Sequence, residues 1–106
     1  MATIQFDWDE ENIGHLARHG ISPAETEQVL INWQIDLDSY VRNGEERVVQ
    51  AGETDRGRIL VVVSTIRHGK TRIVTGWPAK ERIRRYFATQ KRSRDAGRNE
   101  ADGIRE

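Results

Sequence analysis

Four short segments with strand-like patterns follow one another between residues 35 and 77, and no more than five residues separate each segment from the next. Each gap holds turn-forming residues, among them Asn43-Gly44, Gly57 and Gly69. A parallel crossover needs about a dozen residues or more, so gaps this short permit antiparallel neighbours. The segments therefore predict an antiparallel meander.

The patterns within the segments indicate how each strand lies in the sheet. Ile59 to Ile66 is apolar on both faces, as expected of a central strand. From Ile35 the period is two, which places Ile35, Leu37, Ser39 and Val41 on one face and Asp36, Asp38 and Tyr40 on the other. Thr3 to Trp8 also alternates and predicts one more short strand, so the sheet has four or five strands.

Two helices are predicted before the meander. Asp9 can cap the first helix, which ends near Gly20, and its apolar face consists of Ile13, Leu16 and Ala17. The second opens with Ser22-Pro23-Ala24-Glu25, a capping box with proline at the first helical position.

A third helix is predicted after Pro78, with a buried stripe made of Ala79, Ile83, Tyr86 and Phe87. Apolar residues become rare beyond about Lys91. We therefore expect one α+β domain over residues 1–90, in which two N-terminal helices and one C-terminal helix pack on the sheet. Residues 91–106 form a polar tail that is flexible or ordered by a partner.

Charge divides the chain into two opposite halves. Residues 1–55 hold three basic and twelve acidic side chains, whereas residues 56–106 hold fourteen basic and five acidic ones. The basic half favours a polyanion such as nucleic acid, or an acidic protein, as partner. The alternative is that the charges only solvate the two ends.

The composition excludes several classes of protein. Without cysteine there is no disulfide framework, thiolate metal site or cysteine nucleophile. The longest apolar run, Ile59 to Val63, is too short to cross a bilayer, and the N-terminus does not read as a signal peptide. We expect a cytoplasmic protein without membrane contact.

Several motifs, taken in order, resemble the BrnT family, the toxins of a bacterial type II toxin-antitoxin system. They are Phe6-Asp7-Trp8-Asp9, Arg18-His19-Gly20-Ile21-Ser22, Glu45-Glu46-Arg47, Gly52, Arg72-Ile73-Val74-Thr75 and Tyr86. The resemblance implies a RelE-like fold and ribonuclease activity that arrests growth. It also implies neutralisation by a ribbon-helix-helix antitoxin. The chain would then contact DNA only through that antitoxin.

One segment departs from the family pattern. Where the family usually has Ser-Ala-Arg after the last strand, this chain has Thr75-Gly76-Trp77. The segment that leads to Tyr86 is also one residue shorter than the commoner form. The tryptophan indicates either a weakened ribonuclease or a subgroup that contacts RNA by stacking.

Metal-independent ribonucleases need a base, an acid, and cations for the charge that develops on the phosphate. Arg47 and Arg72 are the predicted phosphate-binding cations, with exposed decoration of the sheet as the alternative. Arg72→Ala and Arg47→Ala are expected to leave the fold intact but to abolish growth arrest, because exposed arginines contribute little to stability. Tyr86, with Arg82 beside it, is a predicted acid or base, or a tyrosine that only packs. Glu46 is the predicted carboxylate base, or an ordinary ion-pair partner.

Other residues are predicted to contact RNA without taking part in the chemistry. Trp77 either stacks on a base or belongs to the core, and Lys80, Arg84 and Arg85 supply general attraction. His15 and His19 have the spacing of metal ligands on a helix, but no third ligand is evident. We therefore expect neither a metal nor a cofactor.

The leading hypothesis is a toxin that acts as a metal-independent endoribonuclease and is neutralised by an antitoxin. The alternative is a non-catalytic, toxin-like module that complexes an antitoxin and contributes to regulation at DNA. A third possibility is an RNA or ribosome binder that does not cleave.

Overall fold

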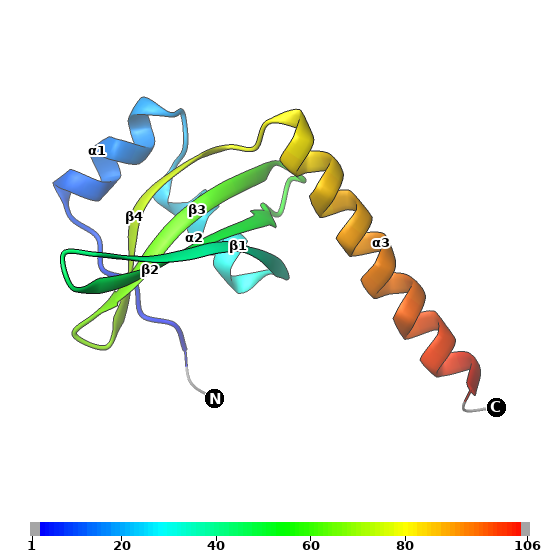
Figure 1. The fold of residues 1–106 in the computed structure, drawn as a ribbon. Coiled ribbons are helices and arrows are strands. Elements are labelled where there is room, and N and C mark those ends of the chain that lie inside the picture. Colours follow the sequence, from blue (N-terminus) through cyan, green and yellow to red (C-terminus); the bar gives the residue numbers. More distant parts are fainter. Residues whose placement is uncertain (1–2, 105–106) are drawn as a thin grey trace.

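A computed structural model describes residues 3–104, with side chains for residues 3–97, and it contains three helices and one four-stranded sheet within that range (Figure 1). Helices α1 (Glu10–Arg18) and α2 (Pro23–Ile31) come first. Strands β1 (Gln34–Arg42), β2 (Glu45–Glu53), β3 (Ile59–Arg67) and β4 (Lys70–Pro78) follow, and α3 (Glu81–Ile104) ends the described chain. The strands are antiparallel in the order β1-β2-β3-β4, so the predicted α+β meander is confirmed.

Two tight turns form one end of the sheet. Asn43 and Gly44 join β1 to β2 with φ angles of 53° and 77°, and His68 and Gly69 join β3 to β4 with φ angles of 54° and 77°. A two-residue loop with both residues at positive φ is the hairpin turn whose twist matches that of the strands. We call this end of the sheet the hairpin end.

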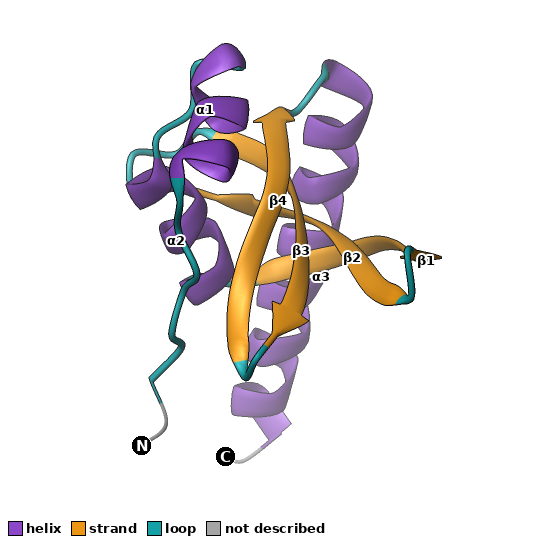
Figure 2. Ribbon diagram, turned by 90° about the vertical axis from the view of Figure 1, so that its left-hand side faces the viewer, coloured by secondary structure: helices purple, strands orange, loops and turns teal. Residues whose placement is uncertain are grey.

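Helices cover both faces of the sheet (Figure 2). On the face that we call the α1/α2 face, one apolar cluster contains Leu16, Ile21, Val29, Leu30, Leu60, Val62 and Ile73. On the opposite face, the α3 face, Ala51, Val61, Ala79 and Phe87 form a second cluster, against which Trp33, Ile35, Leu37 and Trp77 pack. Among the helices of residues 3–104, none combines the length and the apolar character that crossing a membrane requires.

The predicted N-terminal strand, Thr3 to Trp8, is wrong apart from one bridge. Phe6 forms a single parallel bridge with Thr71 on the outer edge of β4. Asp7 donates its N–H to the Thr71 carbonyl at 2.9 Å, and Thr71 donates to Gln5 at 2.8 Å. Pairing stops there because Asp9 caps α1 only two residues later.

The alternation predicted for the first strand of the meander is also wrong. A β-bulge lies between Asp36 and Asp38, so the side chains beyond it change faces. Ile35 lies opposite Ala51, and Tyr40 lies opposite Arg47. Ala51 and Arg47 are four residues apart on β2, so their side chains point to the same face. Ile35 and Tyr40 therefore point to the same face, the α3 face.

Both predicted N-terminal caps are confirmed, but the buried face of α1 is not the predicted one. The Asp9 and Ser22 side chains each close a capping box. The residues that α1 buries are Asn12 and Leu16, whereas Ile13 is 41% exposed. This side of α1 faces the sheet because the Asn12 amide donates hydrogen bonds to the backbone carbonyls of Asp7 and Ile73.

Helix α3 is held to the domain by side chains between Phe87 and Arg94. Phe87 is buried and contacts Trp33 with a centroid separation of 5.5 Å, Lys91 pairs with Glu53 at 2.8 Å, and the Arg94 guanidinium lies 4.7 Å from the Trp33 ring. Tyr86 is 48% exposed and is not part of the buried stripe, contrary to the prediction. The helix then runs past residue 90 and projects away from the sheet (Figure 1).

Candidate functional site

Three arginines from three adjacent strands share the α3 face at the hairpin end. Arg72 on β4 lies opposite Thr65 on β3, and Arg67 is two residues beyond Thr65, so both point to one face. Val49 lies opposite Val63, which places Arg47 of β2 on that face as well. Helix α3 makes its contacts at the other end of the strands and leaves this part of the face uncovered (Figure 1).

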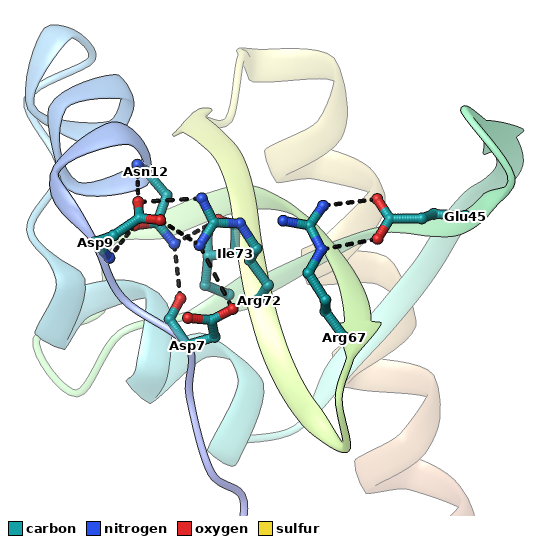
Figure 3. Close-up of polar contacts among 7 residues, drawn as sticks. All are labelled: Asp7, Asp9, Asn12, Glu45, Arg67, Arg72 and Ile73. Carbon is teal, nitrogen blue, oxygen red and sulfur yellow. Dashed lines mark hydrogen bonds and ion pairs between the residues drawn. The ribbon is translucent and has the colours of Figure 1, made fainter.

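Arg72 is buried, with 6% of its surface exposed, and two carboxylates neutralise it. Its guanidinium lies 2.9 Å and 3.1 Å from the two oxygens of Asp9 and 3.6 Å from Asp7 (Figure 3). The hydrogen bond from Arg72 is the main reason that the pKa of Asp9 is lowered, and the same bond raises the pKa of Arg72. The expectation that Arg72 decorates an exposed face is therefore wrong.

Asn12 holds the Asp9 end of this arrangement in place. Its buried amide donates to the carbonyls of Asp7 at 2.8 Å and Ile73 at 3.0 Å, and its oxygen accepts the Asp9 N–H at 2.8 Å (Figure 3). Because a buried amide with all these partners is strongly oriented, α1 is fixed against β4. Sequence analysis missed Asn12, since a polar residue in a short helix carries no signal of burial.

Arg67 is also paired within the chain. It donates to both oxygens of Glu45, at 2.9 Å and 2.8 Å, which is a bidentate arrangement (Figure 3). These hydrogen bonds lower the pKa of Glu45 and raise that of Arg67. Neither residue was singled out as a site residue from the sequence.

Arg47 differs from the other two arginines. Its nearest charged partner is Glu45 at 3.8 Å, beyond hydrogen-bond distance, although only 14% of its side chain is exposed. Within the described residues its Nε is buried without a hydrogen-bond partner. A buried donor left unpaired is costly, and a bound anion would satisfy it. Tyr40 lies directly opposite Arg47 and is 38% exposed, so a hydroxyl accompanies this cation.

A protein-family model described as "Ribonuclease toxin, BrnT, of type II toxin-antitoxin system" matches residues 8–82. The chain belongs to the BrnT family. The match includes Arg47, Arg67 and Arg72 and ends before Tyr86. A search of curated proteins finds no match to this chain. The family pairs a ribonuclease toxin with an antitoxin, so an antitoxin partner and an RNA substrate follow from membership.

Several site residues predicted from the BrnT resemblance lie away from Arg47. Glu46 follows Glu45 in β2 and faces the α1/α2 side, where it lines a groove with Val48 and Ser64. Glu46 and Arg47 therefore do not meet at one phosphate. Tyr86 and Arg82 line a shallow depression beside Asp36 and Leu37. Asp36 lies opposite Gln50 and Tyr40 lies opposite Arg47, three residues apart on β2, which corresponds to about 10 Å along the strand.

The remaining predicted RNA contacts surround α3. Trp77 lies opposite Val61 and packs, partly buried, against the apolar cluster of the α3 face. Lys80 and Arg84 are exposed, and Arg85 is exposed while it pairs with Glu81 at 2.9 Å. Lys80 directly precedes α3, and Arg84 and Arg85 lie in its first two turns.

In the part of the chain whose side chains are described, no three metal-binding side chains of the His, Cys, Asp or Glu types come together. His15 and His19 are both exposed on α1 or at its end. Among the residues whose side chains are described, no third metal-binding side chain joins His15 and His19.

Proposed function

We propose that this chain is an endoribonuclease toxin that acts in the cytoplasm without a metal ion and that a ribbon-helix-helix antitoxin neutralises it. In this proposal the toxin domain is residues 1–90, and a partner stabilises the polar continuation of α3 that begins at residue 91. Contact with DNA occurs only through the antitoxin. Membership of the BrnT family supports the general function, and the arginines of the α3 face support the chemistry.

The observation that carries the proposal is Arg47, a largely buried guanidinium with a free donor among cations from two neighbouring strands. Attack of a ribose 2′-hydroxyl on phosphorus builds negative charge on the phosphate oxygens. A guanidinium offers a planar pair of donors to those oxygens and needs no metal. We assign Arg47 to this contact.

The paired arginines have a different part in the proposed mechanism. Arg72 and Arg67 carry carboxylate partners, so each adds less net charge than Arg47, and Glu45 positions the guanidinium of Arg67. The phenol of Tyr40, opposite Arg47, is the proposed proton donor or acceptor at this phosphate. Tyr86 and Arg82, which lie beside Asp36, bind a neighbouring phosphate of the same RNA. Trp77, Lys80, Arg84 and Arg85 contact the flanking RNA. Glu46 is left out because it faces the other side of the sheet.

The test compares RNA cleavage by the wild-type chain and Arg47 variants in the presence of EDTA. Arg47→Ala should slow single-turnover cleavage by about 100-fold or more, because it removes the transition-state cation. Arg47→Lys should restore only part of the rate, since an ammonium lacks the fork of donors. Arg56→Ala, in the exposed turn between β2 and β3, is the control and should cleave like wild type. Cleavage that appears only with added Mn²⁺ or Zn²⁺ would contradict the proposal.

The second candidate function is a non-catalytic module that binds an antitoxin. One observation favours it: carboxylates already neutralise Arg72 and Arg67. The resemblance in sequence agrees, because it implies an arginine at the position of Trp77. Wild-type protein that binds the antitoxin tightly but leaves RNA intact under every condition would select this function.

A further inference from the structure

A groove lies on the α1/α2 face, on the opposite side of the sheet from Arg47. Its volume is about 340 Å³, and the aliphatic side chains that line it are those of Ile4, Leu30, Val48 and Ile66. Polar groups accompany them, among them Glu46 and Gln50. This mixture of aliphatic walls and a few polar groups is typical of a surface that binds a ligand or a partner.

The apolar surface extends beyond the groove itself. Ile66 is 68% exposed and Ile4 is 44% exposed at the groove, and Val41, which lies opposite Glu46 on β1, is 71% exposed. Three exposed aliphatic side chains from β1, β3 and the N-terminal segment therefore share one face. A small molecule in the groove would leave Val41 in water, whereas a polypeptide segment would cover all three. Exposed apolar patches of this kind mark protein-protein contacts.

The charge of this surface identifies the class of partner. Among the described residues that line the groove, Glu46 is the ionisable one. Gln50, four residues further along β2, also lines the groove and donates a hydrogen bond at 2.8 Å to Asp36, which lies opposite it on β1. The acidic half of the sequence forms α1, α2, β1 and β2. A phosphate backbone would be repelled here, whereas a segment with aliphatic and basic side chains would be attracted.

We infer that this groove is a docking site for a basic, aliphatic segment of the antitoxin. The inference rests on the proposed function for the identity of the partner as a DNA-binding antitoxin. Such a protein carries basic side chains, because DNA binding depends on the neutralisation of phosphates. The antitoxin then contacts the α1/α2 face while RNA contacts the α3 face. Substitutions in the groove should therefore weaken neutralisation by the antitoxin and leave toxicity unchanged.

The experiment measures the affinity of variants of the whole chain for a purified ribbon-helix-helix antitoxin that neutralises the wild-type chain. Ile66→Lys removes an aliphatic contact and adds a repelling charge, and Glu46→Lys reverses the charge of the groove. Each should weaken binding by about tenfold or more. Ile31→Lys is the matched control, because Ile31 is 64% exposed but does not line the groove, and it should stay within about twofold of wild type.

The free variants are then tested for growth arrest and RNA cleavage. Ile66→Lys and Glu46→Lys should be as active as wild type and should escape neutralisation. Wild-type affinity in both variants would overturn the inference, even if RNA cleavage confirms the proposed function. A chain that dimerises alone and loses its dimer on Ile66→Lys would overturn it in favour of a second copy. Because affinity is measured without RNA, absence of cleavage would refute only the enzyme proposal.

Discussion

The guanidinium of Arg72 lies 2.9 Å from the carboxylate of Asp9, and the same carboxylate accepts the Asn12 N–H at 3.1 Å and caps α1. One acidic side chain thus joins the start of a helix to the edge strand β4. Asn12 adds a second link between these elements through the carbonyl of Ile73. The junction therefore has a structural role, whatever part Arg72 has in chemistry.

We predict that Arg72→Ala destabilises the fold by about 2 kcal/mol, since removal of a buried ion-pair partner leaves carboxylates without their cation. The cost should stay below that of a fully buried pair, because the side chains of Asp7 and Asp9 are 33% and 52% exposed. Urea denaturation gives the free energy of unfolding. Arg85→Ala, which breaks an exposed pair on α3, should change it by no more than about 0.5 kcal/mol. Equal effects of the two substitutions would contradict this reading.

The Asp9 contact also predicts how stability depends on pH. The folded-state pKa of Asp9 lies below its ordinary value of 3.8, so the native state favours the ionised carboxylate. Its contribution is complete above pH 3.8 and is lost as the pH falls through the folded-state pKa. Thermal unfolding from pH 7 to pH 2 should therefore show a stability gap between wild type and Asp9→Asn that closes only at the acidic end. A constant gap across this range would rule out the linkage.

The features that sequence predicted correctly depend on neighbouring residues. The capping boxes at Asp9 and Ser22 and the hairpin turns through Gly44 and Gly69 involve side chains within three positions of one another. Local sequence determines such features, so they can be predicted without knowledge of the fold.

The features that sequence missed depend on distant contacts. Arg72 and Asp9 are 63 positions apart, and nothing in the local sequence pairs them. The bulge between Asp36 and Asp38 interrupts an alternation that was otherwise regular, so Tyr40 was assigned to the wrong face. The basic residues that face RNA in our proposal were recognised from their charge, but their internal partners were not.

Helix α3 gives a prediction about RNA affinity. Arg84 is exposed near the start of α3, and each neutralised phosphate releases a counterion. Arg84→Ala should weaken RNA binding uniformly across sequences and lower the slope of log K against log salt by about 1. Fluorescence anisotropy over a range of salt concentrations measures this slope. An unchanged slope would show that this side of α3 does not contact RNA.

Trp77→Arg tests whether an arginine at this position strengthens catalysis. Val61 and Thr65 lie four residues apart on β3, so their partners Trp77 and Arg72 share the α3 face. The substitution adds a guanidinium to the face that holds Arg47, and we expect cleavage to rise by about tenfold. The lost indole packing should lower stability by about 1–3 kcal/mol, since Trp77 is only partly buried.

Trp77→Leu separates these two effects, because it loses much of the packing without a gain of charge. Cleavage should rise in Trp77→Arg and stay at or below the wild-type rate in Trp77→Leu, with both rates measured below the unfolding temperature of each variant. A rise in both would mean that the indole obstructs the site and that the added charge is irrelevant. If wild type, Trp77→Arg and Arg47→Ala are all inert on RNA but bind the antitoxin, the face is not catalytic, and the binding-module function accounts for the fold without any chemistry at Arg47.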